Sequence, residues 1–239
     1  MAYTRDGILA QVYVAFGQGT GAVRVSQGAC VALSERYLPR IDEDLVARWE
    51  SEAGQVLERI RAIGRTAAAH AALAGENVLS PDRLTDAARR VESFSLTPLC
   101  PPDPYAVGHR DDLGTEPYTR DGILAQILVA FGQGTGAVRI SQEACQPFHE
   151  RYLPRIDRDV LAAWRSEGVQ VLERIRAIGR SAALQTSLAG GTAISRETVV
   201  HAMKSVEAVS LTSWCPPGGG ETSDPAGTPG AEAVATLSV

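Results

Sequence analysis

The chain has 239 residues, of which 44% are hydrophobic and 21% are charged, and its formal net charge is −5. These values are typical of a globular protein, exclude the fibrous classes and argue against a protein that coats nucleic acid through general basicity. No apolar run reaches the roughly 18 residues that a membrane-spanning helix needs, and the first residues do not resemble a secretory signal. We therefore expect a cytoplasmic protein with no membrane partner.

A segment of about 100 residues occurs twice in the chain, because residues 3–102 align without a gap on residues 118–217, with roughly 63 identical pairs. A repeat of this quality predicts two copies of one structural module. We divide the chain into a first copy (3–100), a linker rich in Pro, Asp and Gly (101–117), a second copy (118–215) and a disordered tail (216–239).

Each copy is expected to begin with two helices. In the first copy, Thr4 can cap a helix that should end at Gly17, where a glycine-rich turn begins. Residues 23–25 then favour a short extended segment. Ser26 can cap a second helix, which Pro39 should end or kink.

The third helix is expected to be the longest, since apolar residues recur at steps of three or four from Ile41 to Ala71. Gly75 should end it, and Ser80-Pro81-Asp82 predicts the start of a fourth helix. A small module cannot cover so long an apolar stripe by itself, so the stripe should pack against the other copy. The residues expected at this contact are Trp49, Val56, Ile60, Trp164, Val171 and Ile175. The sequence thus predicts an all-α fold: a tandem duplication of a four-helix module, packed as a pseudo-twofold intramolecular dimer.

Comparison of the copies weighs against catalysis, because an active site common to both must use residues that both contain. None of the four histidines, at positions 70, 109, 149 and 201, aligns with a histidine in the other copy. The chain also lacks a Gly-x-Ser-x-Gly elbow and closely spaced cysteine ligands, and the glycine turn at 17–21 lacks the lysine of a nucleotide-binding loop. We expect no catalytic residues, no metal site and no cofactor, although one copy could have lost an activity.

The cysteines form two equivalent pairs, Cys30 with Cys145 and Cys100 with Cys215. Four reduced thiols are expected, with Cys30 and Cys145 on a buried helix face. The alternative is one disulfide in each copy, joining Cys30 to Cys100 and Cys145 to Cys215, which needs an oxidising compartment.

The order of helix, short extended loop, helix, short loop and helix resembles the histone fold. Arg24-Val25-Ser26 and Arg139-Ile140-Ser141 resemble the first loop of that family, and the segments 78–82 and 193–197 resemble the second. The segment between the loops is longer than the central helix of the family, and Pro39 interrupts it. The resemblance implies a handshake of two fused copies, as in histone doublets. It also implies contacts with DNA phosphates, for which the candidates are Arg5, Arg24, Arg120 and Arg139.

Three functional hypotheses remain open. The first is a non-catalytic protein that binds a macromolecule, either DNA or a protein. The second is a helical enzyme or small-molecule-binding protein with an apolar pocket between the copies, holding shared polar residues such as Tyr37, Arg40 and Gln55. The third is a structural or assembly protein that forms a homo-oligomer through exposed apolar stripes.

Overall fold

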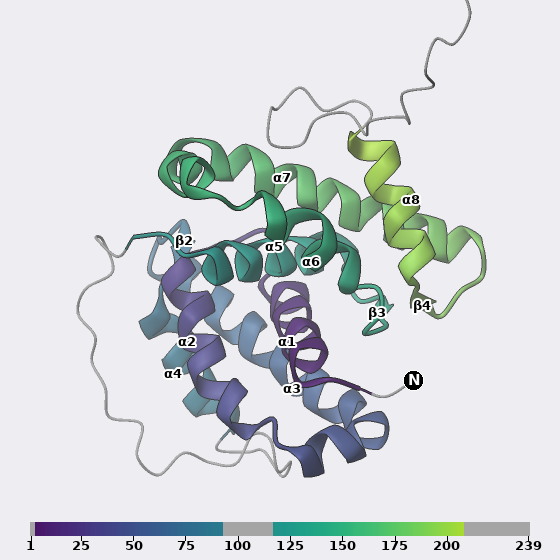
Figure 1. Cartoon of the computed structure of the whole chain (residues 1–239). Helices are drawn as coiled ribbons and strands as arrows, with labels where there is room; N and C mark the ends of the chain where they lie inside the picture. Colours follow the sequence, from purple (N-terminus) through teal and green to yellow (C-terminus); the bar gives the residue numbers. More distant parts are fainter. Residues whose placement is uncertain (1–2, 93–116, 208–239) are drawn as a thin grey trace, which may run out of the picture.

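A computed structural model of the chain describes residues 3–92 and 117–207, which are mostly helical (Figure 1). The predicted linker, apart from Pro117, and the predicted tail lie outside the described residues, as do Cys100, His109 and Cys215. In the two described ranges, no helix is both long and apolar enough to cross a membrane.

The described elements of the first half (residues 3–92) follow the expected order. They are α1 (Arg5–Thr20), β1 (Arg24–Val25), α2 (Gln27–Tyr37), the 3-10 turn η1 (Leu38–Arg40), α3 (Glu43–Leu73), β2 (Val78–Leu79) and α4 (Pro81–Glu92). The predicted caps are confirmed: the side-chain oxygens of Thr4 and Ser26 accept hydrogen bonds from the amides of Gly7 and Ala29, both at 3.1 Å. As predicted, the second helix ends next to Pro39: α2 stops at Tyr37, and Pro39 lies in the 3-10 turn that follows.

The second half (residues 117–207) repeats this order of elements. They are α5 (Arg120–Thr135), β3 (Arg139–Ile140), α6 (Gln146–Tyr152), the 3-10 turn η2 (Leu153–Arg155), α7 (Arg158–Leu188), β4 (Ala193–Ile194) and α8 (Arg196–Glu207). One difference is the shorter α6, because Pro147 occupies its first turn and residues 142–145 form turns before it.

The expected end of the first helix at Gly17 is wrong. Helix α1 continues to Thr20, and it ends at Gly21, whose φ of 59° suits glycine. Gly17 instead lies where α1 crosses α5: a Cβ on Gly17 would stand 2.0 Å from the carbonyl oxygen of Val129. This glycine therefore serves close helix packing rather than helix termination.

Helices α1 and α5 form the centre of the molecule. They pack against each other, with α3 and α4 on one side and α7 and α8 on the other (Figure 1). In α1, every residue from Ala10 to Gly17 is buried, as expected for a helix that is covered all round.

The expectation that the long-helix stripes pack against the other half is corrected by this arrangement. Helix α3 packs mainly on α1 and α4, and α7 packs mainly on α5 and α8, so each stripe is covered chiefly within its own half. The difference arises because α1 and α5 are apolar on all sides. Each of them covers the apolar stripe of the long helix in its own half with one face and packs against the other half with another face.

Each half contains one pair of short parallel strands. Arg24 and Val25 pair with Val78 and Leu79, and β3 pairs with β4 in the same way. The strands of one half meet because the chain reverses at η1, between α2 and α3. Two helices thus stand between the two strands of each half, α2 and α3 in the first and α6 and α7 in the second.

Candidate functional site

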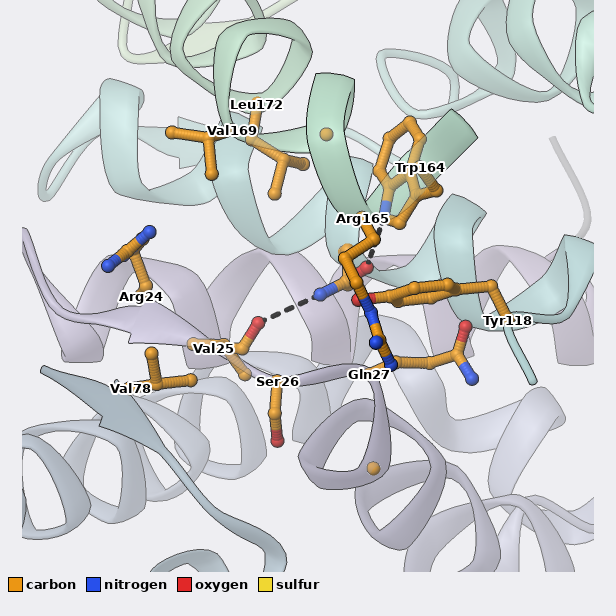
Figure 2. Close-up of a pocket in the computed structure, with 13 residues that line it drawn as sticks. Arg24, Val25, Ser26, Gln27, Val78, Tyr118, Trp164, Arg165, Val169 and Leu172 are labelled. Carbon is orange, nitrogen blue, oxygen red and sulfur yellow. Dashed lines mark hydrogen bonds between the residues drawn. The ribbon is translucent and has the colours of Figure 1, made fainter. Parts of the chain in front are cut away.

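Two buried glutamines connect the halves next to the tryptophans that the sequence singled out. The side-chain N–H of Gln126 donates to the carbonyl oxygen of Val25 at 2.9 Å, and its Oε1 accepts from the indole of Trp164 at 2.8 Å (Figure 2). Gln11 bonds likewise to Ile140 at 3.0 Å and to Trp49 at 2.8 Å. Each tryptophan is thus linked to the opposite half through one glutamine, which bonds the indole and also a backbone carbonyl across the joint.

A second pair of glutamines adds to this joint. Gln18 donates to the carbonyl oxygen of Val138 at 2.7 Å and accepts from Arg61 at 2.6 Å. Gln133 donates to the carbonyl oxygen of Val23 at 2.6 Å and accepts from Arg176. The amide nitrogen of each glutamine bonds the opposite half and its amide oxygen bonds an arginine of its own half. These bonds fix how the two halves are aligned along the joint.

The other predicted contact residues lie in the core. The buried side chains are Val56, Ile60, Val171 and Ile175. They belong to α3 and α7, which pack mainly on the first helix of their own half. They therefore contact the joint only indirectly, through α1 and α5.

A pocket of about 280 Å³ opens beside Gln126, between the two halves, and we call it the interface pocket (Figure 2). The first half contributes Arg24, Val25, Ser26, Gln27, Gly28 and Val78, and the second contributes Tyr118, Gln126, Trp164, Arg165, Gly168, Val169 and Leu172. Strand β1, the start of α2 and the first turns of α7 therefore position the lining side chains.

The interface pocket is cationic. Arg24 and Arg165 are exposed, and neither forms a hydrogen bond or an ion pair with any described residue. No Asp or Glu occurs among the described residues that line the pocket. The N-terminus of α2, which Ser26 caps, adds partial positive charge. Two guanidinium groups thus line one cavity, and the described part of the chain gives them no counterion.

The interface pocket also has an apolar wall. Val78 is 41% exposed and Val169 is 49% exposed, and both belong to the lining with Leu172 and the indole of Trp164. In Figure 2, Val169 and Leu172 project from α7 on the side opposite Val78. A ligand that combines an anion with an apolar part meets both requirements of this lining.

The equivalent positions elsewhere in the chain carry different charges. At the offset of 115 positions, Arg24 corresponds to Arg139, but Arg165 corresponds to Glu50 and Gly28 to Glu143. The interface pocket thus has two arginines and a glycine at positions where the aligned residues are one arginine and two glutamates. The cationic character belongs to the interface pocket and not to both sets of positions.

The structure separates the four predicted phosphate-binding arginines. Arg24 lines the interface pocket, and Arg139 is exposed in the equivalent loop without a partner among the described residues. Arg5 and Arg120 donate to the carbonyl oxygens of Leu38 and Leu153, both at 2.9 Å. These two arginines hold the start of α1 and of α5 against the 3-10 turns.

The polar residues expected in a pocket between the copies do not line the interface pocket. Tyr37 is buried, the guanidinium carbon of Arg40 lies 5.8 Å from the centre of its ring, and Gln55 is exposed on α3. Sequence reasoning missed Arg165 and Tyr118, which only the fold brings to Arg24. The available signal was the reversal of charge between Glu50 and Arg165 in otherwise similar segments.

The cysteines described by the structure are unsuited to nucleophilic chemistry. Cys30 and Cys145 are free and buried, and burial raises the pKa of both thiols, that of Cys145 to about 12. At neutral pH both remain protonated, whereas the thiolate is the nucleophile. Within residues 3–92 and 117–207, no group of three or more metal-ligating side chains occurs.

Comparison with known proteins gives no relative of this chain. No family model matches it, and neither a curated protein nor a solved structure matches it. Function is therefore inferred from the contacts, exposure and charge of this chain alone.

Proposed function

We propose that the protein is a non-catalytic binding protein in which two similar halves act as one pseudo-twofold body. The interface pocket of this body takes a small anionic ligand with an apolar part. The observation that carries the proposal is a pair of arginines, Arg24 and Arg165, that have no counterion among the described residues and lie at a pocket with exposed valines.

The pseudo-twofold arrangement is supported by contacts that recur in both directions across the joint. Gln11 and Gln126 make equivalent bonds, and Gly17 and Gly132 each meet a carbonyl oxygen of the opposite central helix. A duplicated module that pairs with itself accounts for both the sequence repeat and these contacts.

The chemistry of the interface pocket favours a carboxylate or a phosphate. A guanidinium offers paired N–H donors that match two oxygens of either group. A hydrogen bond to a charged group contributes roughly 1.5–3 kcal/mol, and Arg24 and Arg165 reach the pocket from opposite halves. The volume is close to the lower end of the range of small-molecule pockets, roughly 300–1,000 Å³, so the ligand is expected to be small.

Titration with 1-naphthyl phosphate tests the proposal, with neutral 1-naphthol as the matched ligand. We expect saturable binding of the phosphate, weaker binding of naphthol, and quenching of tryptophan fluorescence because Trp164 lines the pocket. Arg165→Ala should weaken phosphate binding by about tenfold or more. Arg139→Ala is the matched control, because this arginine lies in the equivalent loop but does not line the pocket. Equal affinity of wild type and Arg165→Ala would rule the proposal out.

DNA is a second candidate ligand, favoured by one observation. Arg24 and Arg139 lie in equivalent loops of the two halves, and both are exposed and have no partner within residues 3–92 and 117–207. The charge balance weighs against it. Residues 3–92 contain eleven basic and twelve acidic residues, and residues 117–207 contain eleven and nine. So small an excess of positive charge provides little of the phosphate neutralisation on which non-specific DNA binding depends.

The two candidates respond differently to the same variants. DNA binding should weaken about equally in Arg24→Ala and Arg139→Ala and should fall steeply with rising salt. Binding in the interface pocket should weaken in Arg24→Ala but not in Arg139→Ala, because only Arg24 lines the pocket. Fluorescence anisotropy with a short duplex at low salt distinguishes them.

A further inference from the structure

A second pocket lies between α6, η2 and α8 of the second half, and we call it the α6–α8 pocket. It has a volume of about 460 Å³ and shares no lining residue with the interface pocket. Its apolar lining consists of Pro147, Pro154, Val200 and Met203, and its charged lining consists of Glu150, Arg151, Arg155 and Lys204.

Two of the charged groups in the α6–α8 pocket already have partners. Arg151 donates to the buried carboxylate of Glu207, with 2.8 Å between the Nε of the arginine and the Oε1 of the glutamate. Glu150 accepts from Arg196 at 2.8 and 3.0 Å. Within the described residues, these pairs leave Arg155 and Lys204 without an ion-pair partner.

Arg155 carries a donor that needs an acceptor. Its Nη1 atom is buried and has no hydrogen-bond partner among the described residues. Leaving a buried charged donor unpaired is costly, and such atoms are rare in folded proteins, so this guanidinium is a candidate for pairing with an added acceptor. Lys204, which is exposed, adds a second positive charge at the same pocket.

The first half has no such combination at the equivalent positions. There Arg40 stacks over the ring of Tyr37, and Arg89 lies 3.9 Å from Asp86. The aligned side chains are also smaller or more polar, since Pro147, Val200 and Met203 correspond to Ala32, Thr85 and Ala88. The second half thus has larger apolar side chains at these positions than the first, and its described residues give Arg155 and Lys204 no ion-pair partner.

We propose that the α6–α8 pocket binds a monocarboxylate with an apolar body. The planar carboxylate fits the forked donors of Arg155, with the ammonium of Lys204 as a second contact. Met203 and Val200 on α8, with the two prolines, cover the body of the ligand. This site is independent of the interface pocket and does not require the function proposed for it.

Calorimetric titration with octanoate and decanoate, below their micellar concentrations, tests the proposal on the full chain. Each buried methylene should tighten binding about fourfold, so decanoate should bind about 15-fold more tightly than octanoate. Decanamide, which has the same body without the charge, should bind at least about tenfold more weakly. Absence of saturable decanoate binding would overturn the proposal, and tighter binding of decyl phosphate would overturn the assignment of a carboxylate.

Three variants separate binding from a structural role. Arg155→Ala should weaken decanoate binding about tenfold or more without lowering the thermal midpoint, because the unpaired buried donor is removed. A structural arginine would show the opposite pattern. Lys204→Ala, an exposed substitution that should fold in any case, should weaken binding severalfold. Arg40→Ala, the matched change in the first half, should leave decanoate binding unchanged, and an equal loss in this variant would contradict the site.

Discussion

Replacing Gly17 by alanine tests the contact that joins the two halves. An added Cβ would stand 2.0 Å from the carbonyl oxygen of Val129, whereas a close carbon–oxygen contact is about 3.3 Å. The crossing helices α1 and α5 would have to separate by roughly 1.3 Å. A gap of this order forfeits a large part of the dispersion energy along the crossing, and overpacked cores lose about 1–3 kcal/mol or more.

The same substitution at an open helical position should have the opposite effect. Gly54 lies within α3, is exposed, and has nothing within 4 Å of an added Cβ. Gly54→Ala should therefore raise the free energy of unfolding by about 0.5–1 kcal/mol through helix propensity alone. Gly17→Ala has the same propensity gain and should still lower the free energy of unfolding, by about 1–3 kcal/mol net.

The double variant Gly17→Ala/Gly132→Ala makes the test sharper. A Cβ on Gly132 would stand 2.1 Å from the carbonyl oxygen of Val14 at the same crossing. One separation of the helices admits both methyl groups, so the double variant should lose less stability than the sum of the single losses. Urea unfolding followed by circular dichroism measures all four free energies. Strict additivity, or stabilisation by Gly17→Ala, would refute the reasoning.

Three further predictions concern the core. Trp49→Phe should lower the free energy of unfolding by about 1–3 kcal/mol in urea titrations, because Gln11 loses the donor to its buried Oε1; an unchanged midpoint would contradict this. The thiol of Cys145 has its pKa raised from 9.0 to about 12, so its contribution to stability should be complete below pH 9 and be lost as the pH rises towards 12. The thermal midpoint of the wild type should therefore fall between pH 9 and 12, and Cys145→Ala should show a smaller fall over the same range. Residues 1–100 expressed alone should not form a stable monomer by sedimentation and circular dichroism, because α1 would expose the apolar face that α5 covers.

Local features of the fold could be predicted from the sequence because their causes are local. Thr4 and Ser26 act as caps, Pro39 breaks a helix and Gly75 follows the end of α3 with a φ of 70°, each through the chemistry of one residue and its neighbours. Gly17 was misread because the same residue type serves both helix ends and close helix crossings. Only the partner helix, more than one hundred residues away, distinguishes these roles.

Which helix covers which apolar face could not be predicted from the sequence, for a similar reason. Apolar spacing identifies the stripe on α3 but does not identify the helix that covers it, because α1 presents apolar residues in every direction. The interface pocket depends on this pairing. Arg24 was named from its loop, but Arg165 reaches the same cavity only because α7 lies over β1 in the fold.

The linkage of two similar halves in one chain has a consequence for the interface pocket. In a homodimer of identical chains, every substitution appears twice, so both symmetry-related grooves must change together. A single chain is free of this constraint: Arg165 can line the interface pocket while Glu50 occupies the aligned position of the first half. One half can thus change the charge at such a position while the aligned residue of the other half stays as it is.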